Sequence, residues 1–134
     1  MIRVGWSVGV VAVILAGGCA QSPEPYLEVV HAQRAALNEM AEILAKIDDE
    51  TSLAAAKASL DERLERFEKI AAKASALPAP SDGVRRRVEQ DKVLLDSAVR
   101  NLKYYVGRVQ RLNLKGAPAF FGHFEAKNRS LFGV

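Results

Sequence analysis

Three side chains in this sequence belong to the types that most often act as nucleophiles or transition-metal ligands: Cys19, His31 and His123. Glu28 precedes His31 by three residues, and residues at that spacing share one face of a helix. Two-metal carboxylate sites in helical bundles use this Glu-x-x-His pattern, but they also need a second such pair and two further inward glutamates. The sequence has neither, and His31 falls outside the apolar stripe described below. We therefore predict no metal site and no cofactor.

The remaining polar residues form no pattern that is typical of catalysis. No serine lies in a Gly-x-Ser-x-Gly setting, and no glycine-rich loop is spaced to hold a phosphate. The acidic run at residues 48–50 lacks the glycine and the ligand spacing of a calcium loop, so we interpret it as a solvated turn. We predict no catalytic residues, and we expect that the protein is not an enzyme.

The single cysteine follows an apolar run at the N-terminus. Arg3 precedes a largely apolar segment of twelve residues at positions 4–15, and Gly17 and Gly18 stand directly before Cys19. This arrangement is typical of a cleaved secretion signal, and the segment is shorter than the roughly 20 residues that a spanning helix needs. Because a lone cysteine cannot form an internal disulfide, Cys19 needs another role.

The stretch Leu15-Ala16-Gly17-Gly18-Cys19 resembles the lipobox of bacterial lipoproteins. The resemblance implies a thioether-linked diacylglyceryl group on Cys19, cleavage between Gly18 and Cys19, and attachment to a membrane through the lipid. The usual leucine three positions before the cysteine is Ala16 here, and an ordinary secretory signal is the alternative. Since Ala20 rather than aspartate follows the cysteine, the resemblance implies a place in the cell envelope on the outer membrane, facing the periplasm, rather than on the inner membrane.

Cleavage at this point divides the chain into four parts. We expect a signal peptide at residues 1–18, a tether at 19–25, a helical bundle at 26–114 and an aromatic and basic C-terminal segment at 115–134. The 116 residues from Cys19 onward are enough for one domain with a single core. The tether spans at most about 3.6 Å per residue, which holds the domain within roughly 20 Å of the bilayer.

Apolar residues recur at helical spacing in three segments. We predict helices at about residues 26–47, 52–77 and 84–112, the second of them capped by Asp49 or Thr51. The third has an apolar residue at every seventh position, namely Val88, Leu95, Leu102 and Val109. Long helices joined by short turns predict an all-α fold, an antiparallel three-helix bundle running up, down and up with a short C-terminal helix or tail. The alternative is a helical hairpin that completes its core with a second copy.

The composition changes after Gly116. Pro118 can open a short fourth helix, and four of the five phenylalanines occur in the last 15 residues. In the favoured interpretation the rings of this segment cap an open end of the bundle. In the other, the segment rests in the membrane interface beside Lys127 and Arg129. The apolar residues concerned are Phe120, Phe121, Phe124, Leu131 and Phe132.

Charge is divided unevenly along the chain. Residues 20–82 carry a net charge of −5 and residues 83–134 a net charge of +7. In the favoured interpretation the basic face of the third helix complements its acidic neighbours in the bundle or is solvated. Otherwise it binds an anionic lipid, an anionic glycan or an acidic protein. The candidate anion-binding residues are Arg85, Arg86, Arg87, Arg100, Lys103, Arg108 and Arg111.

A second resemblance covers residues 43–81, with their Ile-Asp-Asp-Glu-Thr-Ser turn, alanine-rich helix and Leu-Pro-Ala-Pro-Ser stop. This segment resembles the helical parts of uncharacterised small bacterial lipoproteins, and the resemblance implies no activity and no functional residue. We expect a membrane-anchored structural or protein-interaction module, with a protein partner or self-association as its mode of action. An envelope protein that binds anionic lipid or glycan is the alternative. Nucleic acid is excluded as a partner by the exported location and by the lack of a groove-reading motif.

Overall fold

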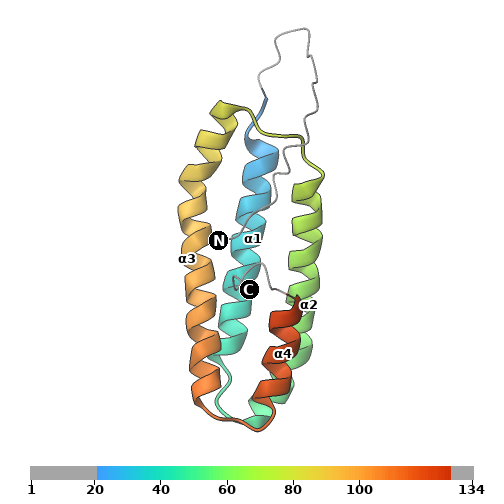
Figure 1. The fold of residues 1–134 in the computed structure, drawn as a ribbon, viewed down its shortest axis with the longest axis vertical. Coiled ribbons are helices and arrows are strands. Elements are labelled where there is room, and N and C mark those ends of the chain that lie inside the picture. The colour runs from blue at the N-terminus through green and yellow to red at the C-terminus, as the bar shows by residue number, and fades with distance from the viewer. Residues whose placement is uncertain (1–20, 128–134) are drawn as a thin grey trace.

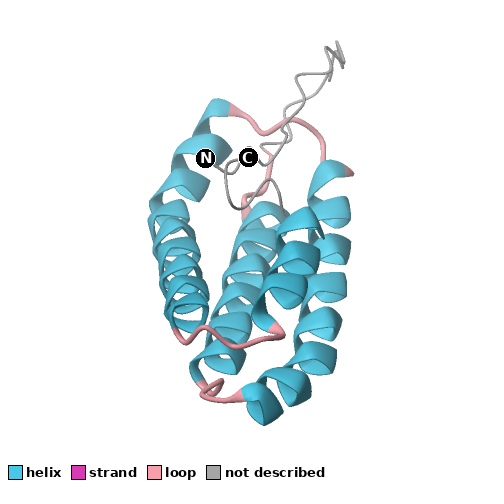
Figure 2. Cartoon of the chain, turned by 60° about the horizontal axis from the view of Figure 1, so that its bottom comes forward, coloured by secondary structure: helices cyan, strands magenta, loops and turns pink. Residues whose placement is uncertain are grey.

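The computed structural model describes residues 21–127, so Cys19, Arg129, Leu131 and Phe132 lie outside the described residues. The described chain forms four helices and no strand, which confirms the all-helical prediction for this part of the sequence. The helices pack into a bundle with loops at its two ends (Figures 1 and 2). They are α1 (Glu24–Ala45), α2 (Glu50–Ser75), α3 (Asp82–Arg111) and α4 (Ala117–Lys127).

The first helix supplies the centre of the bundle. α1 lies between α3 and α2 in Figure 1 and packs against both. Its apolar positions recur at helical spacing, so they form one face that is removed from water. Burial of such a face, rather than intrinsic propensity, provides most of the stability of a helix in a protein. The most deeply buried apolar residues of this part of the chain are Tyr26, Leu37, Met40, Leu44 and Ile47.

One polar residue interrupts this face. Gln33 lies in the same row as Tyr26 and Met40 and is only 3% exposed. Its side-chain oxygen Oε1 has no hydrogen-bond partner among the described residues. A buried polar atom without a partner destabilises the folded state by about 1–3 kcal/mol, so Gln33 is a weak point of the core.

A capping box starts α2. Asp49 has an extended backbone, and its carboxylate Oδ1 accepts the backbone N–H of Ser52 at 2.7 Å. The Ser52 hydroxyl in turn accepts the backbone N–H of Asp49 at 3.0 Å. This reciprocal pair satisfies two N–H groups that a helix start otherwise leaves without partners. The helix therefore begins at Glu50, two residues before the predicted start, with Asp49 as the cap.

The third helix is the longest and follows its predicted register. The Ser81 hydroxyl accepts the backbone N–H of Val84 at 3.3 Å and caps the helix, which again begins two residues earlier than predicted. Of the residues at every seventh position, Leu95, Leu102 and Val109 are at most 2% exposed. The heptad register that the sequence predicts for the core is confirmed at these positions.

The fourth helix joins the bundle rather than forming a separate tail. α4 contacts both α2 and α3, and it lies beside the lower half of α2 in Figure 1. Phe120, Phe121 and Phe124 are buried in the same core cluster as the long helices. The rings of Phe120 and Phe121 meet edge to face, with their centroids 5.0 Å apart. The burial of these three phenylalanines agrees with the interpretation in which the rings of this segment pack on the bundle, rather than with a segment that rests in the membrane interface.

At one end of the bundle, side-chain contacts join the start of one helix to the loop before another. The Glu50 carboxylate accepts the backbone N–H groups of Lys115 and Gly116, which joins the start of α2 to the loop before α4. A Cβ atom at Gly116 would lie 3.3 Å from Leu53, so glycine allows this close approach. Within this loop Asn113 adopts a left-handed backbone with φ of 53°, a conformation that asparagine tolerates well.

Candidate functional site

The lipidation candidate Cys19 lies outside the described residues, but the chain becomes attached to the bundle directly after it. The Gln21 side chain donates to the Tyr26 hydroxyl at 2.7 Å and to the carbonyl of Ala79 at 3.2 Å. Its oxygen accepts the backbone N–H of Ser81 at 2.5 Å. Gln21 is therefore held against the loop between α2 and α3, two residues beyond Cys19.

Tyr26 completes this attachment. Its hydroxyl donates to the carbonyl of Pro78 at 2.6 Å, so the first turn of α1 is joined to the loop between α2 and α3. Burial raises the pKa of Tyr26, and the hydrogen bond from Gln21 opposes that rise. The start of the bundle is consequently a hydrogen-bonded corner, and α1 begins at Glu24, inside the segment predicted as a short tether at residues 19–25.

The candidate anion-binding residues of α3 do not pair with the acidic helices. Arg85 and Arg87 make ion pairs only with acidic residues of α3 itself, Asp82 at 3.9 Å and Asp91 at 2.9 Å. Glu39 of α1 pairs instead with Arg63 of α2, at 2.6 Å. Among residues 21–127, no lysine or arginine of α3 forms an ion pair with α1 or α2. Ion pairing with acidic neighbours is therefore not seen in this region, whereas the exposure of most of these side chains agrees with the other form of the favoured interpretation, a solvated face.

These basic residues also do not form one compact site. Arg108 is half-buried and donates to the backbone carbonyl of Ile47 at 3.0 Å, which joins α3 to the turn before α2. Arg100 donates to the Ser97 hydroxyl at 3.2 Å. The side chains of Arg86, Lys103 and Arg111 are exposed and make no ion pair within the described chain. The seven candidates are spread along the whole of α3 and face more than one side of it.

His31 takes part in the one ion-pair cluster between α1 and α3. Its Nε2 atom lies 2.7 Å from Oδ2 of Asp91, whose other oxygen accepts from Arg87 at 2.9 Å. The hydrogen bond from Arg87, and then that with His31, lowers the pKa of the Asp91 carboxyl. No hydroxyl or thiol within residues 21–127 makes a recorded contact with His31, so this pair lacks the nucleophile that a catalytic dyad requires.

His123 and the other potential metal ligands are dispersed. His123 on α4 lies 3.4 Å from Asp61 on α2, in a second histidine–carboxylate pair. In the part of the chain that the structure describes, no three His, Cys, Asp or Glu side chains gather closely enough to hold a metal ion. None of the helices in this part is both long and apolar enough to cross a membrane.

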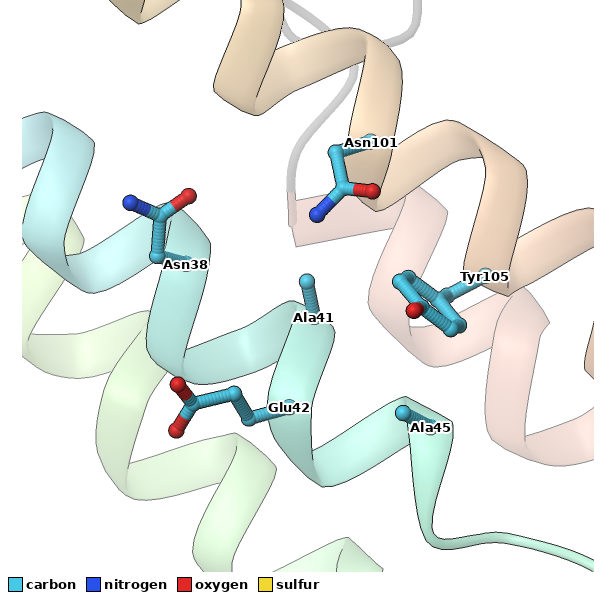
Figure 3. A pocket seen from close by; sticks show the side chains of 6 residues that line it. All are labelled: Asn38, Ala41, Glu42, Ala45, Asn101 and Tyr105. Atoms are coloured by element: carbon cyan, nitrogen blue, oxygen red, sulfur yellow. The ribbon is translucent and has the colours of Figure 1, made fainter.

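A shallow groove of about 230 Å³ lies between α1 and α3. Figure 3 shows Tyr105 reaching from α3 toward Ala41 and Ala45 of α1. The groove is lined by Asn38, Ala41, Glu42, Ala45, Asn101 and Tyr105.

Sequence reasoning missed a set of exposed apolar side chains on α3. The signal was present in the sequence for those that fall outside the heptad positions of the core, whereas Leu112 continues the row of Ala98 and Tyr105 beyond the end of the helix. Large apolar residues on the solvent side of a helix mark an interaction surface when they lie together. The exposed large apolar residues of the described chain are Val93, Leu94, Tyr104 and Leu112, all on or directly after α3.

Comparison of the chain with protein-family models, with curated proteins and with solved structures finds no match.

Proposed function

We propose that this chain is a lipid-anchored helical lipoprotein that acts as a structural or protein-interaction module at the bacterial envelope. The observation that carries the proposal is the run Leu15-Ala16-Gly17-Gly18-Cys19 after an apolar segment, directly before a folded bundle. Lipidation explains the only cysteine, and two or three acyl chains would hold the protein firmly at a bilayer. The absence of aspartate after Cys19 favours the outer membrane, facing the periplasm.

The attachment of Gln21 supports a close approach of the bundle to the membrane. Only Ala20 separates Cys19 from Gln21, whose side chain is bonded to the loop between α2 and α3. An extended chain spans about 3.6 Å per residue, so the lipidated cysteine lies within roughly 7 Å of Gln21. The proposed module therefore sits directly against the bilayer.

The order of the long helices forms part of this proposal. We take α1, α2 and α3 to run up, down and up, with α4 returning beside α2. The bonds from Gln21 and Tyr26 to the loop before α3, and from Glu50 to the loop before α4, support this order. Such a bundle offers a partner its outer surfaces rather than a deep pocket.

Crosslinking and affinity capture from intact cells test the function. The tagged wild-type chain should bring down a specific envelope partner, and Cys19→Ala should lose both that partner and incorporation of radiolabelled palmitate. The double variant Lys57→Gln/Lys73→Gln, which changes only exposed residues of α2, serves as the control and should keep both the partner and the palmitate. Capture of the same partner by the unlipidated Cys19→Ala chain would contradict the requirement for an anchor.

A second candidate function is binding of an anionic lipid or glycan through the basic face of α3. It is favoured by the observation that no basic residue of α3 pairs with the acidic helices in residues 21–127. Association with vesicles that contain phosphatidylglycerol should then weaken as salt is raised, since exposed charges are screened. The triple variant Arg85→Gln/Arg86→Gln/Arg87→Gln should weaken it further. Binding that is indifferent to salt would argue against this function.

A further inference from the structure

One side of α3 combines arginines with exposed apolar side chains along nearly its whole length. The positions alternate between four- and three-residue steps, a spacing that keeps them on one side of a helix. Every member is exposed except Gly107, which is half-buried. We call this side the outer stripe, and its members are Arg86, Gln90, Val93, Ser97, Arg100, Tyr104, Gly107 and Arg111.

Two contacts indicate that the arginine side chains lie along the outer stripe. The guanidinium of Arg100 donates to the hydroxyl of Ser97, one turn earlier, at 3.2 Å. A Cβ atom at Gly107 would lie 3.4 Å from Nη1 of Arg111, so the Arg111 side chain runs back over that glycine. The absence of a side chain at Gly107 leaves room for this arrangement.

Three of the eight members of the outer stripe are arginines, and the exposed residues along one edge of it are Glu89, Asp96 and Lys103. Arg86, Arg100 and Arg111 form no ion pair within residues 21–127, whereas the neighbouring Arg85 and Arg87 are paired with acids of α3. These three unpaired arginines extend over 25 residues, which is about 37 Å of helix. An anionic partner must therefore offer negative charge over a long, continuous surface.

Apolar side chains lie between these arginines. Val93 is 61% exposed and Tyr104 is 59% exposed, and Leu94 adds a further apolar side chain beside Val93. Basic side chains near an anionic bilayer surface are attracted to it, and exposed apolar side chains beside them can enter the interface. There the apolar groups enter the headgroup boundary while the guanidinium groups stay with the phosphates.

We propose that the outer stripe is the surface through which the bundle lies flat on a bilayer rich in anionic phospholipid. A second copy of this chain is a poor occupant, because pairing two outer stripes would place arginines against arginines. A bilayer supplies continuous phosphate charge over the required length, and each arginine near such a surface contributes about 1 kcal/mol. The inference rests on the proposed lipid anchor, which brings α3 within reach of the membrane.

Site-directed spin labelling of the purified, lipidated protein tests the orientation. Single labels are placed at Val93→Cys on the outer stripe and at Ala58→Cys, an exposed position of α2. The protein is reconstituted into phosphatidylcholine vesicles with or without phosphatidylglycerol. With phosphatidylglycerol, the label at residue 93 should gain collisions with oxygen and lose collisions with a water-soluble nickel complex. The label at residue 58 should remain accessible from water in both kinds of vesicle.

Matched charge variants assign the effect to the outer stripe. Arg86→Gln/Arg100→Gln/Arg111→Gln should abolish the shift at residue 93, because it weakens the contact by roughly a hundredfold. Lys57→Gln/Lys69→Gln/Lys73→Gln removes the same charge from exposed positions of α2 and should leave the shift intact. Circular dichroism melting shows that each variant is folded, as expected for exposed positions.

Two results would overturn the proposed orientation. The first is that, on phosphatidylglycerol vesicles, the label at residue 93 remains as accessible to the water-soluble nickel complex as the label at residue 58. If residue 93 is nevertheless shielded from water in intact cells, an acidic protein rather than the bilayer covers the outer stripe. The second is that the α2 variant Lys57→Gln/Lys69→Gln/Lys73→Gln abolishes the accessibility change at residue 93 as fully as the variant of the outer stripe does. Flotation of the protein with neutral phosphatidylcholine vesicles tests the lipid on Cys19 separately. Failure to float with these vesicles would contradict the proposed anchor. The comparison of the two labels on anionic vesicles would still decide the orientation.

Discussion

His31 of α1 and Asp91 of α3 lie 2.7 Å apart, and this contact between residues 60 positions apart in the sequence joins the two helices. Arg87 contacts the other carboxylate oxygen of Asp91 at 2.9 Å. The cluster is exposed on the His31 side, with 57% of that side chain accessible to solvent. Its role is to hold α1 and α3 together at the surface.

Because of the Asp91 carboxylate, the stability of the fold should decrease in the acidic pH range. Arg87 and then His31 lower its pKa below the usual 3.8, so the folded state favours the charged form. This stability is fully present above pH 3.8 and is lost as the pH falls through the lowered pKa of Asp91. In thermal melts recorded at several pH values, Asp91→Asn should show a smaller fall in melting temperature on acidification than wild type. The exposed Asp96→Asn is the control, and an equal change in both variants would contradict a specific role for the cluster.

Adjacent leucines test the register of α3. Leu95 is 2% exposed and Leu94 is 46% exposed. Leu95→Ala should lower the free energy of unfolding by about 2–5 kcal/mol, because it removes buried apolar volume and leaves a cavity. Leu94→Ala should change it by less than about 0.5 kcal/mol, as surface substitutions usually do. Urea denaturation measures both, and similar losses in the two variants would show that the register is wrong.

Phe124 tests whether α4 belongs to the core. Its side chain is 1% exposed and belongs to the cluster that the long helices form. Phe124→Ala should destabilise the protein by about 3–5 kcal/mol, the usual range for a buried phenylalanine. His123→Ala changes the preceding, exposed residue and should have a small effect. A melting temperature that is the same for wild type and Phe124→Ala would favour a membrane-resting segment instead.

Gln33 offers a substitution that should stabilise the protein. Its Oε1 atom is buried without a partner among the described residues, while its neighbours on α1 are apolar. Gln33→Leu keeps a similar volume and removes that uncompensated burial, so the free energy of unfolding should rise by about 1–3 kcal/mol. Gln110→Leu, at an exposed position of α3, should leave it nearly unchanged. Destabilisation by Gln33→Leu in chemical denaturation would show that the amide has a partner that matters.

The sequence predicted the helices well because their cores follow simple periodicity. The rows through Met40, Leu60 and Leu95 repeat at helical spacing, and all three residues are at most 2% exposed. Helix starts were predicted about two residues late for α2 and α3, because Asp49 and Ser81 act as caps directly before Glu50 and Asp82. Capping depends on local backbone geometry that apolar periodicity does not record.

The contacts between helices were less predictable. His31 pairs with Asp91, and Glu50 binds the backbone before α4, although the partners are about 60 residues apart in the sequence. These contacts depend on which faces of the helices pack together. The burial of Phe124 likewise depends on the position of α4 against α2 and α3. The sequence also did not predict that Gln21, inside the expected tether at residues 19–25, is hydrogen-bonded to the loop before α3.

The most direct test of the proposed function is intact mass spectrometry of the protein purified from bacterial membranes. The account predicts that the mature chain begins at Cys19 and carries a mass increase equal to a diacylglyceryl group, with a further acyl group where the amino terminus is modified. Cys19→Ala should retain residues 1–18 and carry no lipid. A wild-type chain that is cleaved at another residue, or that begins at Cys19 with an unmodified thiol, would contradict the account.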